Sequence, residues 1–374
     1  MKIPKEIPFF EEDDIESISN DVKNILKSKR LVLGNYTREF ENKFAEYIGT
    51  KHAVAVNSCT AALQISLMYA DVKNKEVLVP TNTFIACPNT VIYSGGKPVF
   101  VDIDKDTFCM DINDLQNKIN SNTRAIMPVH LGGLPIPEMN AIIDLCKDHN
   151  LYLVEDCSHA HGAMIDDKKV GSLGDAGCFS LFATKIMSVG VGGILTTNDS
   201  NLAQFAEELR HQGGLGGPGK IESFDKFGYD WMMSEITASI GIHQLNKLEK
   251  QLERRNRIAE EYRKHLTNID GIELPPSYDN IRNSYWRFII KLDKSIDRDQ
   301  LKDKLRKDYN IEAGVLYPLP CHLQPLYRKM GHKEGECPVV EEELKRQLTL
   351  PINSYMDDEA ISYVISTLDN LLQR

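Results

Sequence analysis

Two residues of the sequence, a lysine and an aspartate, are candidates for catalysis because each lies at the end of an apolar segment. Asp156 ends the apolar run that begins at Leu151, and Lys185 ends a segment of apolar and small residues that begins at Gly177. Ligands of open α/β sheets bind at the carboxyl ends of strands, so we expect Asp156 at that edge of a sheet. Lys185 precedes a glycine-rich stretch and is expected on a turn, not on a solvated helix.

The two side chains together fit one cofactor chemistry. A partly desolvated lysine amine can lose its proton and condense with an aldehyde. A carboxylate near a pyridine nitrogen keeps that nitrogen protonated, which makes pyridoxal 5'-phosphate (PLP) an electron sink. Taken singly, Lys185 could be an ordinary surface lysine and Asp156 a helix N-cap. The pair, on neighbouring strand ends, favours a PLP site.

Short apolar segments alternate with helical patterns through the first half of the chain. They lie at 52–56, 77–80, 98–101, 124–129 and 151–154, and further segments follow at 177–185 and 194–197. This alternation predicts an α/β fold with a mostly parallel sheet flanked by helices. Two amphipathic helices are expected before the sheet, one starting near Glu11 with acids in its first turn and one ending at Gly49.

The second half of the chain indicates a smaller α/β domain. Helical periodicity runs from Met233 to Tyr262, and an apolar segment at 288–292, a helix at 298–309 and a last helix from Asp357 follow. We therefore expect a large domain at residues 1–245 and a small C-terminal domain at 246–374, bridged by the long helix. The glycine-rich stretch at 210–218 is expected to be a mobile loop.

One strand, at 52–56, leads directly into a helix at 57–67. The N-terminus of a helix can hold a phosphate through its free N–H groups, and Thr60 can add a hydroxyl. Simple capping of the helix by Ser58 and Thr60 is the ordinary alternative.

The composition argues against several classes of protein. A net charge of −10 disfavours a nucleic-acid or anionic-membrane surface, although local basic pockets still allow an anionic substrate. No apolar run approaches the about 20 residues that span a bilayer. The eight cysteines show no C-x-x-C spacing, and no apolar signal segment is seen at the N-terminus. We expect a soluble cytoplasmic protein with reduced thiols and no metal site.

Several segments, in order, resemble one known family. The segments 155–162 (EDCSHAHG), 170–175 (VGSLGD), 179–185 (FSLFATK) and 192–193 (GG) are similar to the central motifs of the DegT/StrS family. The segments 80–84 (PTNTF), 97–104 (KPVFVDID), 128–131 (PVHL) and 322–325 (HLQP) fall in the family's order, so the likeness covers nearly the whole chain. The resemblance implies a fold-type I PLP enzyme, in most members an aminotransferase. Such an enzyme moves an amino group from glutamate or glutamine to a keto group of a sugar, most often a nucleotide-linked keto-deoxysugar.

The resemblance also implies roles for single residues and a homodimer with shared active sites. Lys185 would hold PLP as a Schiff base and act as general base and acid, and Asp156 would stabilise the pyridinium. His159 would contact the phenolic oxygen, and Phe84 would stack on the ring, although both could be ordinary core residues. Cofactor contacts are implied for Cys59, Thr60, Phe84, Asp156, His159, Ser180 and Lys185, and substrate contacts for Tyr317, His322 and Asp230.

Four positions depart from the family pattern. Asp230 stands where the family usually has an asparagine that reaches the cofactor phosphate of the partner subunit, and a carboxylate beside a phosphate is unfavourable unless it is protonated, turned away or bridged by a cation. Met232 replaces an arginine, Val191 a glutamate and Gly132 a tyrosine. Fewer polar groups at the mouth of the site predict an atypical acceptor.

Two alternative functions remain open from the sequence. The first keeps the cofactor and aminates a keto-cyclitol or another small carbonyl compound. The family's deoxygenating dehydratases carry a histidine in place of the lysine, so Lys185 argues against that branch. The second is a non-enzymatic PLP-binding sensor, which would need a DNA-binding module or a basic patch that the sequence does not show.

Overall fold

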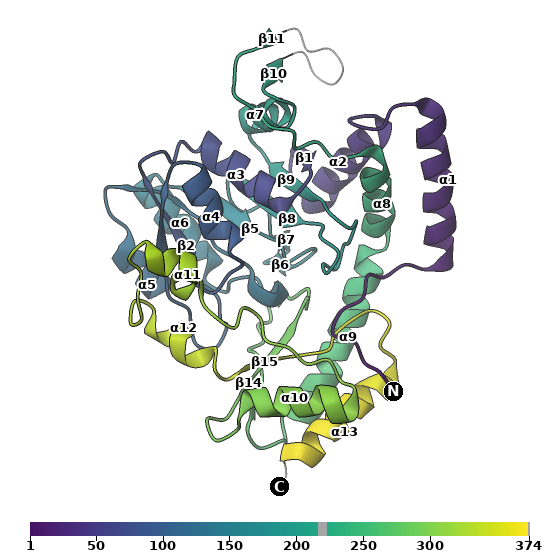
Figure 1. The fold of residues 1–374 in the computed structure, drawn as a ribbon, viewed down its shortest axis with the longest axis vertical. Helices are drawn as coiled ribbons and strands as arrows, with labels where there is room; N and C mark the ends of the chain where they lie inside the picture. The colour runs from purple at the N-terminus through teal and green to yellow at the C-terminus, as the bar shows by residue number, and fades with distance from the viewer. Residues whose placement is uncertain (216–222, 373–374) are drawn as a thin grey trace.

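A seven-stranded mixed sheet forms the centre of the larger part of the molecule (Figure 1). The structure, a computed structural model, describes residues 1–215 and 223–372. The strands lie in the order β1-β9-β8-β5-β4-β2-β3, and β9 runs antiparallel to both of its neighbours while the other pairs are parallel. The strands are β1 (His52–Val56), β2 (Glu76–Pro80), β3 (Lys97–Val101), β4 (Thr123–Ile126), β5 (Tyr152–Asp156), β8 (Ala176–Ser180) and β9 (Gly193–Thr197). The predicted α/β fold with a mostly parallel sheet is confirmed.

The register of β5 and β8 explains why the two candidate residues meet. The strands are parallel, and Asp156 is opposite Cys178. Both strands therefore end at the same edge of the sheet, where β5 ends on Asp156 and β8 leads into the turn that carries Lys185. This edge is the carboxyl end of the parallel strands, as the sequence predicted.

Helices cover both faces of the sheet, because a crossover between parallel strands usually contains one. In the upper half of Figure 1 the sheet is seen between them. The flanking helices are α3 (Cys59–Tyr69), α4 (Ala86–Tyr93), α5 (Ile112–Lys118), α6 (Met139–His149) and α7 (Ser200–Arg210). Helix α3 starts three residues after β1 and is buried along most of its length, which places its N-terminus beside the sheet edge.

The two predicted N-terminal helices are present. Helix α1 (Glu12–Ser28) carries Glu12, Asp13 and Asp14 in its first turn, where carboxylates favour the positive end of the helix dipole. Helix α2 (Asn35–Ile48) ends at Gly49, whose φ of 88° is a conformation that L side chains rarely adopt. Both helices pack on α8 (Glu235–Asn246), and α1 forms the right-hand border of the molecule in Figure 1.

The predicted long helix from Met233 to Tyr262 is in fact two helices. Helix α8 ends at Asn246, α9 (Leu248–Leu266) begins two residues later, and Lys247 between them has φ −108° and ψ 4°. No proline or glycine marks this break in the sequence. The ammonium group of Lys247 forms an ion pair with Asp14 and lies over the rings of Phe9 and Phe10, contacts with segments that are distant in the chain.

A second, smaller unit lies below the large sheet, beside the C-terminus (Figure 1). Its antiparallel sheet has the order β12-β14-β15, and a separate hydrophobic cluster joins this sheet to α9 and to the last helix. The elements of this part are β12 (Ile272–Glu273), β14 (Phe288–Leu292), α10 (Arg298–Tyr309), β15 (Gln347–Leu350) and α13 (Asp358–Leu372). Helices α11 (Pro325–Lys329) and α12 (Pro338–Glu343) lie in the same part of the chain, but their buried apolar residues pack in the large cluster. Residues such as Trp286 and Tyr327 belong to the large cluster instead. The boundary at 245/246 stays a prediction.

Short pairs of strands and turns complete the chain. Strand β6 (Met164–Ile165) pairs with β7 (Lys168–Lys169) and with β13 (Ile281–Arg282), and β10 (Gly214–Leu215) pairs with β11 (Ser223–Phe224). Two 3₁₀ turns are η1 (Leu131–Gly133) and η2 (Cys321–Leu323). Residues 216–218 of the predicted glycine-rich loop lie outside the described residues.

Two further features concern the thiols and the helices of the chain. All eight cysteines are buried and unpaired by disulfides. Within residues 1–215 and 223–372, no helix combines the length and the apolar character that crossing a bilayer requires.

Candidate active site

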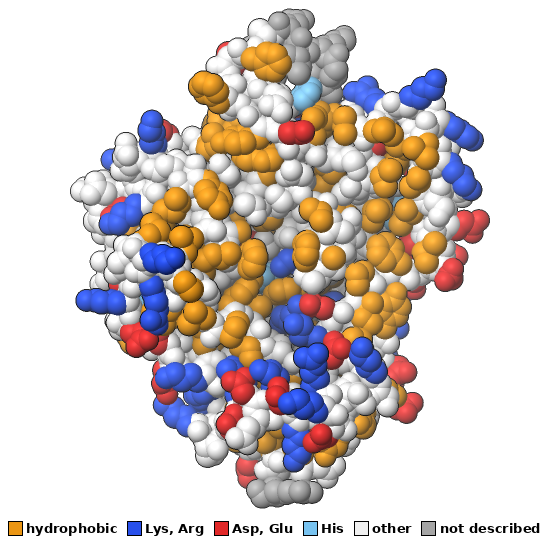
Figure 2. Space-filling view, in the orientation of Figure 1, with side chains coloured by type: hydrophobic (Ala, Val, Ile, Leu, Met, Phe, Trp, Pro, Cys, Tyr) orange, Lys and Arg blue, Asp and Glu red, His pale blue; other side chains and the backbone are white. Residues whose placement is uncertain are grey.

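A cavity of about 420 Å³ opens at the carboxyl edge of the large sheet. Figure 2 shows apolar side chains above the hollow at the centre of this face and basic side chains below it. The walls come from the ends of β5 and β8, the first turns of α3 and α4, the N-terminal segment and the small unit. Eight of the ten predicted site residues line it: Cys59, Thr60, Phe84, Asp156, His159, Ser180, Lys185 and Tyr317.

Lys185 lies on the turn after β8, as the sequence predicted. Its backbone N–H donates to the carbonyl of Phe182, and its Nζ lies 4.0 Å from the ring centre of Trp286. Desolvation lowers the pKa of Lys185 to about 8, although the nearby Asp156 carboxylate acts in the opposite direction. The amine is therefore much more readily deprotonated than that of a solvated lysine, as a nucleophile requires.

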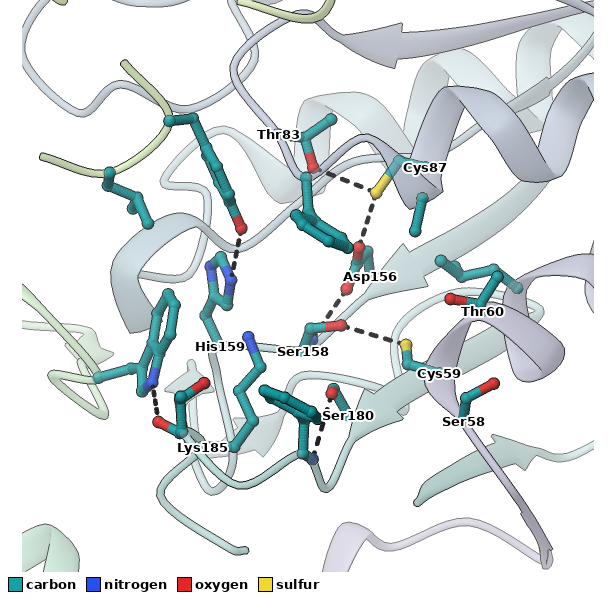
Figure 3. A pocket seen from close by; sticks show the side chains of 18 of the residues that line it. Ser58, Cys59, Thr60, Thr83, Cys87, Asp156, Ser158, His159, Ser180 and Lys185 are labelled. Carbon is teal, nitrogen blue, oxygen red and sulfur yellow. Dashed lines mark hydrogen bonds between the residues drawn. The ribbon is translucent and has the colours of Figure 1, made fainter. Parts of the chain in front are cut away.

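Asp156 is buried, with an exposed fraction of 4%, and both of its oxygens are held. The Sγ of Cys87 donates to Oδ2 over 2.9 Å, and the backbone N–H of Ser158 donates to Oδ1 over 2.9 Å. The Oγ1 of Thr83 lies 3.1 Å from the same sulfur, so a short chain of hydrogen bonds ends on the carboxylate (Figure 3). Sequence reasoning missed Cys87, whose partner is 69 residues away along the chain.

His159 lies on the same side of the cavity as Lys185 (Figure 3). Its ring stacks on Trp286 with a centroid distance of 3.8 Å, and its Nδ1 accepts from the backbone N–H of Gly132. Desolvation, with a smaller effect of the Lys185 charge, holds the pKa of His159 well below its usual range. In the neutral ring the proton is then on Nε2, which lies 3.1 Å from the hydroxyl oxygen of Tyr317.

The opposite side of the cavity carries hydroxyl and backbone N–H groups that suit an anion. Ser58, Cys59 and Thr60 at the start of α3 gather there with Ser180 (Figure 3). Ser58 caps the helix by accepting from the N–H of Ala61, so the capping role predicted for it is present. The remaining first-turn N–H groups have no partner within the helix, and together with the helix dipole they favour a phosphate.

A glycine lets the antiparallel strand β9 pass this helix terminus. A Cβ on Gly193 would lie 2.3 Å from the carbonyl carbon of Ser58 and 2.4 Å from the nitrogen of Cys59. No side chain fits in that space, so Gly193 allows the close approach of two backbones.

Two aromatic side chains from distant segments lie at the mouth. Phe84 is 57% exposed and lines the cavity, and its ring centre lies 6.2 Å from that of Tyr317. An exposed ring of this size beside a cavity is open to stacking on a flat ligand, which its burial in the core would not allow. Tyr317 adopts a φ of 56°, and such strained residues cluster at functional sites.

Glu155, next to Asp156 in the chain, holds the loop at 170–175 in place. Its two oxygens accept from the backbone N–H groups of Gly171, Leu173 and Gly174, and one of them lies 3.2 Å from Nε2 of His130. The glycine-containing motif at 170–175 therefore serves structure, because its amides satisfy a fully buried carboxylate.

Two of the expected substrate residues do not lie at the cavity. His322 is fully buried, with its Nδ1 2.6 Å from Oγ1 of Thr81 and its Nε2 3.0 Å from Glu341, and its substrate contact stays a prediction. Asp230 is exposed and outside the cavity of its own chain. Gly132 is also not at the mouth, because it is buried and an added Cβ would meet Ile289 at 2.8 Å.

Comparison with known proteins decides the family. Residues 12–369 match the DegT/DnrJ/EryC1/StrS aminotransferase family. This chain belongs to that family.

Several proteins similar to this DegT/DnrJ/EryC1/StrS aminotransferase carry names of sugar-modifying enzymes. The GDP-perosamine synthase of Caulobacter vibrioides is 35% identical over 91% of each chain. The UDP-N-acetyl-3-dehydro-α-D-glucosamine 3-aminotransferase of Acidithiobacillus ferrooxidans is 33% identical over 96% of this chain and 94% of its own. The PLP form of the putative sugar aminotransferase Spr1654 from Streptococcus pneumoniae superposes with a TM-score of 0.90, at 26% identity over 100% of this chain and 99% of that one.

The family is PLP-dependent, and the residues of this DegT/DnrJ/EryC1/StrS member fit that cofactor. A desolvated lysine and a buried carboxylate lie on the walls of one cavity, and an anion cradle lies on the wall opposite the lysine. The lysine can react with the aldehyde of PLP, the carboxylate can pair with its pyridine nitrogen, and the anion cradle can bind its phosphate.

Proposed function

We propose that this aminotransferase binds PLP through Lys185 and moves an amino group from glutamate or glutamine to the keto group of a nucleotide-linked sugar. The observation that carries the proposal is the pairing of Lys185, whose pKa is lowered to about 8, with Asp156 at the same cavity. The names of the relatives, which refer to GDP- and UDP-linked sugars, support the choice of acceptor.

Five contacts would hold the cofactor. Asp156 would pair with the pyridine nitrogen, His159 would face the phenolic oxygen and Phe84 would cover the ring. The start of α3, with Thr60, and the hydroxyl of Ser180 would bind the phosphate. When bound, PLP supplies an electron sink that lets a proton leave the carbon beside an amine.

The protein's own groups perform the proton transfer. The Nζ of Lys185 can accept a proton and return it, because its pKa is close to neutral pH. His159 stays neutral, so its Nε2–H donates to an oxygen without adding a charge beside the Lys185 ammonium. Cys87 and Ser158 keep the Asp156 carboxylate in one orientation while the charge on the lysine changes.

A second copy of this chain is part of the proposal. Ile15, Leu26, Leu31 and Val32, which we call the α1 patch, are each about half exposed. Figure 2 shows apolar side chains gathered over α1 and α8 on the right of the molecule. Exposed apolar side chains in such a cluster favour contact with another protein surface. A homodimer would also give Asp230, which does not reach the cavity of its own chain, a site to contact.

The residue at position 191 favours an alternative class of acceptor. Val191 is 64% exposed at the cavity, where the family usually places a glutamate. An apolar side chain there suits a smaller, less polar acceptor, such as a keto-cyclitol.

The test begins with the absorbance spectrum of purified protein reconstituted with PLP. We expect a visible band of the lysine-bound cofactor that glutamate or glutamine bleaches, and loss of this response in Lys185→Ala. Lys294→Ala, a surface lysine paired with Glu342, is the matched control. Protein in the donor-treated form is then offered keto-sugar nucleotides and keto-cyclitols, and return of the band identifies the acceptor. Absence of a lysine-dependent band would contradict the proposed function.

A further inference from the structure

A buried arginine that no function above uses lies on the small-unit wall of the cavity. Arg287 lines the cavity with an exposed fraction of 6%, and its guanidinium carbon lies 3.9 Å from the ring centre of Trp286. Its Nη1 donates to the Trp286 carbonyl over 3.0 Å. A buried guanidinium needs an anionic partner, and in this structure the partner is the carboxylate of Glu6.

Glu6 reaches the cavity wall because the N-terminal segment is tied down on both sides of it. The carbonyl of Pro4 accepts from Asn353, and the carbonyl of Phe9 accepts from Gln244. The Nζ of Lys5 lies 3.9 Å from the second oxygen of Glu6 and also lines the cavity. The Glu6 carboxylate is therefore near two cations, Arg287 and Lys5.

The position of Arg287 relative to Lys185 suits one part of a substrate. The Nζ of Lys185 and the guanidinium carbon of Arg287 each lie about 4 Å from the same ring centre of Trp286, so they are at most about 8 Å apart. In an α-amino acid a single carbon separates the amine from the carboxylate. Because both side chains line the same cavity, a donor that reacts at Lys185 Nζ has the Arg287 guanidinium there as a cationic partner for its carboxylate.

We propose that Arg287, assisted by Lys5, is the carboxylate-binding subsite for the amino donor, and that Glu6 occupies it when no donor is bound. This inference rests on the proposed aminotransferase function. The planar guanidinium binds a carboxylate through two parallel hydrogen bonds, and in this structure it is paired with the Glu6 carboxylate. The phosphates of a sugar nucleotide are the other source of negative charge, but the sugar ring separates them from the reacting keto carbon.

The donor half-reaction of the holoenzyme tests the subsite. In Arg287→Gln we expect the apparent KM for glutamate to rise about tenfold to a hundredfold, as loss of a charged hydrogen bond predicts, with a smaller change in the limiting rate. In Glu6→Gln the internal competitor is neutral, so the same KM should fall. Arg282→Gln is the matched control, because Arg282 pairs with Glu249 and does not line the cavity.

A binding measurement without turnover separates the possible ligands. Calorimetric titration of the holoenzyme with glutarate, a dicarboxylate without an amine, should lose its heat signal in Arg287→Gln and give tighter binding in Glu6→Gln. The same titration with UDP, GDP and dTDP should be unchanged in both variants. Weaker binding of the nucleotides with unaltered glutarate binding would overturn the donor assignment in favour of the acceptor's phosphates.

Two further outcomes would separate the Arg287 subsite from the proposed aminotransferase function. If Arg287→Gln does not fold, Glu6→Gln decides alone, and unchanged glutarate affinity in that variant overturns the subsite. A wild-type protein with a lysine-dependent visible band, but with donor KM insensitive to both substitutions, also overturns the subsite while the proposed aminotransferase stands.

Discussion

At the scale of single residues, the chemistry of the site depends on the desolvation of two side chains, Lys185 and His159. Burial makes the charged forms of Lys185 and His159 unfavourable, so it lowers the pKa of both. For Lys185 this creates a nucleophile near neutral pH. For His159 it creates a neutral hydrogen-bond donor whose tautomer the backbone N–H of Gly132 selects.

The pH dependence of cofactor capture follows from the lowered pKa of Lys185. Below a pKa of about 8 the amine is protonated and cannot attack an aldehyde, so the rate of PLP capture by the cofactor-free protein should rise about tenfold per pH unit and level off above about pH 8. Stopped-flow absorbance between pH 6 and 10 measures this rate. A rise that continues toward 10.5, the ordinary lysine value, would show that Lys185 is solvated.

The thiol of Cys87 should matter through Asp156. Cys87→Ala removes the donor to Oδ2, so we expect the dissociation constant of PLP to increase about tenfold. Cys87→Ser keeps a donor and should recover most of the affinity, whereas a merely space-filling thiol would be replaced equally well by alanine. Cys146→Ala, a buried cysteine of α6 away from the cavity, is the control, and equilibrium dialysis gives the constants.

At the scale of elements, the site forms where two strands end and one helix begins. Strand β5 ends on Asp156, the turn after β8 carries Lys185, and α3 begins on the opposite side beside β9. Their spacing depends on small residues, above all Gly193, which lets β9 touch the start of α3.

Gly193→Ala should therefore damage both stability and cofactor binding. The added methyl group would overlap the backbone of Ser58 and Cys59, and overpacking of this kind costs about 1–3 kcal/mol. Gly49→Ala is the comparison, because its Cβ would meet open space and its cost, about 1 kcal/mol, comes only from the positive φ. Urea unfolding measures the free energies, and only Gly193→Ala should also weaken PLP binding.

At the scale of the whole molecule, segments that are distant in the chain meet around the cavity. The large cluster includes Trp286 and Leu316 from the C-terminal part of the chain, so the wall that carries Arg287 is packed against the large sheet. The N-terminal segment adds Lys5 and Glu6 to the same wall. Residues from both ends of the chain thus complete one site.

The exposed α1 patch leads to a prediction about the proposed homodimer. Leu26→Asp places a charge in an apolar surface that we propose a second copy covers, so sedimentation should show a shift from dimer to monomer. Leu326→Asp, which changes an equally exposed leucine on α11, is the control and should leave the sedimentation coefficient unchanged. A wild-type protein that sediments as a monomer at all concentrations would contradict the dimer.

The sequence by itself determined most of the large sheet and the residues at its edge. Apolar runs predicted the strands to within a few residues, because burial on both faces of a parallel sheet leaves a continuous apolar signature. Lys185 on its turn and Asp156 at its strand end followed from the same local pattern. The break at Lys247 did not, because its cause is contact with α1 and the N-terminal segment.

Only the tertiary structure decided which side chains meet. Cys87 reaches Asp156 across 69 residues, His322 reaches Thr81 across 241, and Glu6 reaches Arg287 from the opposite end of the chain. Periodicity in a sequence reports burial and local conformation, but it holds no information on partners that packing brings together from distant segments. The burial of His322, the support of Asp156 and the arginine wall of the cavity are properties of the packed molecule for that reason.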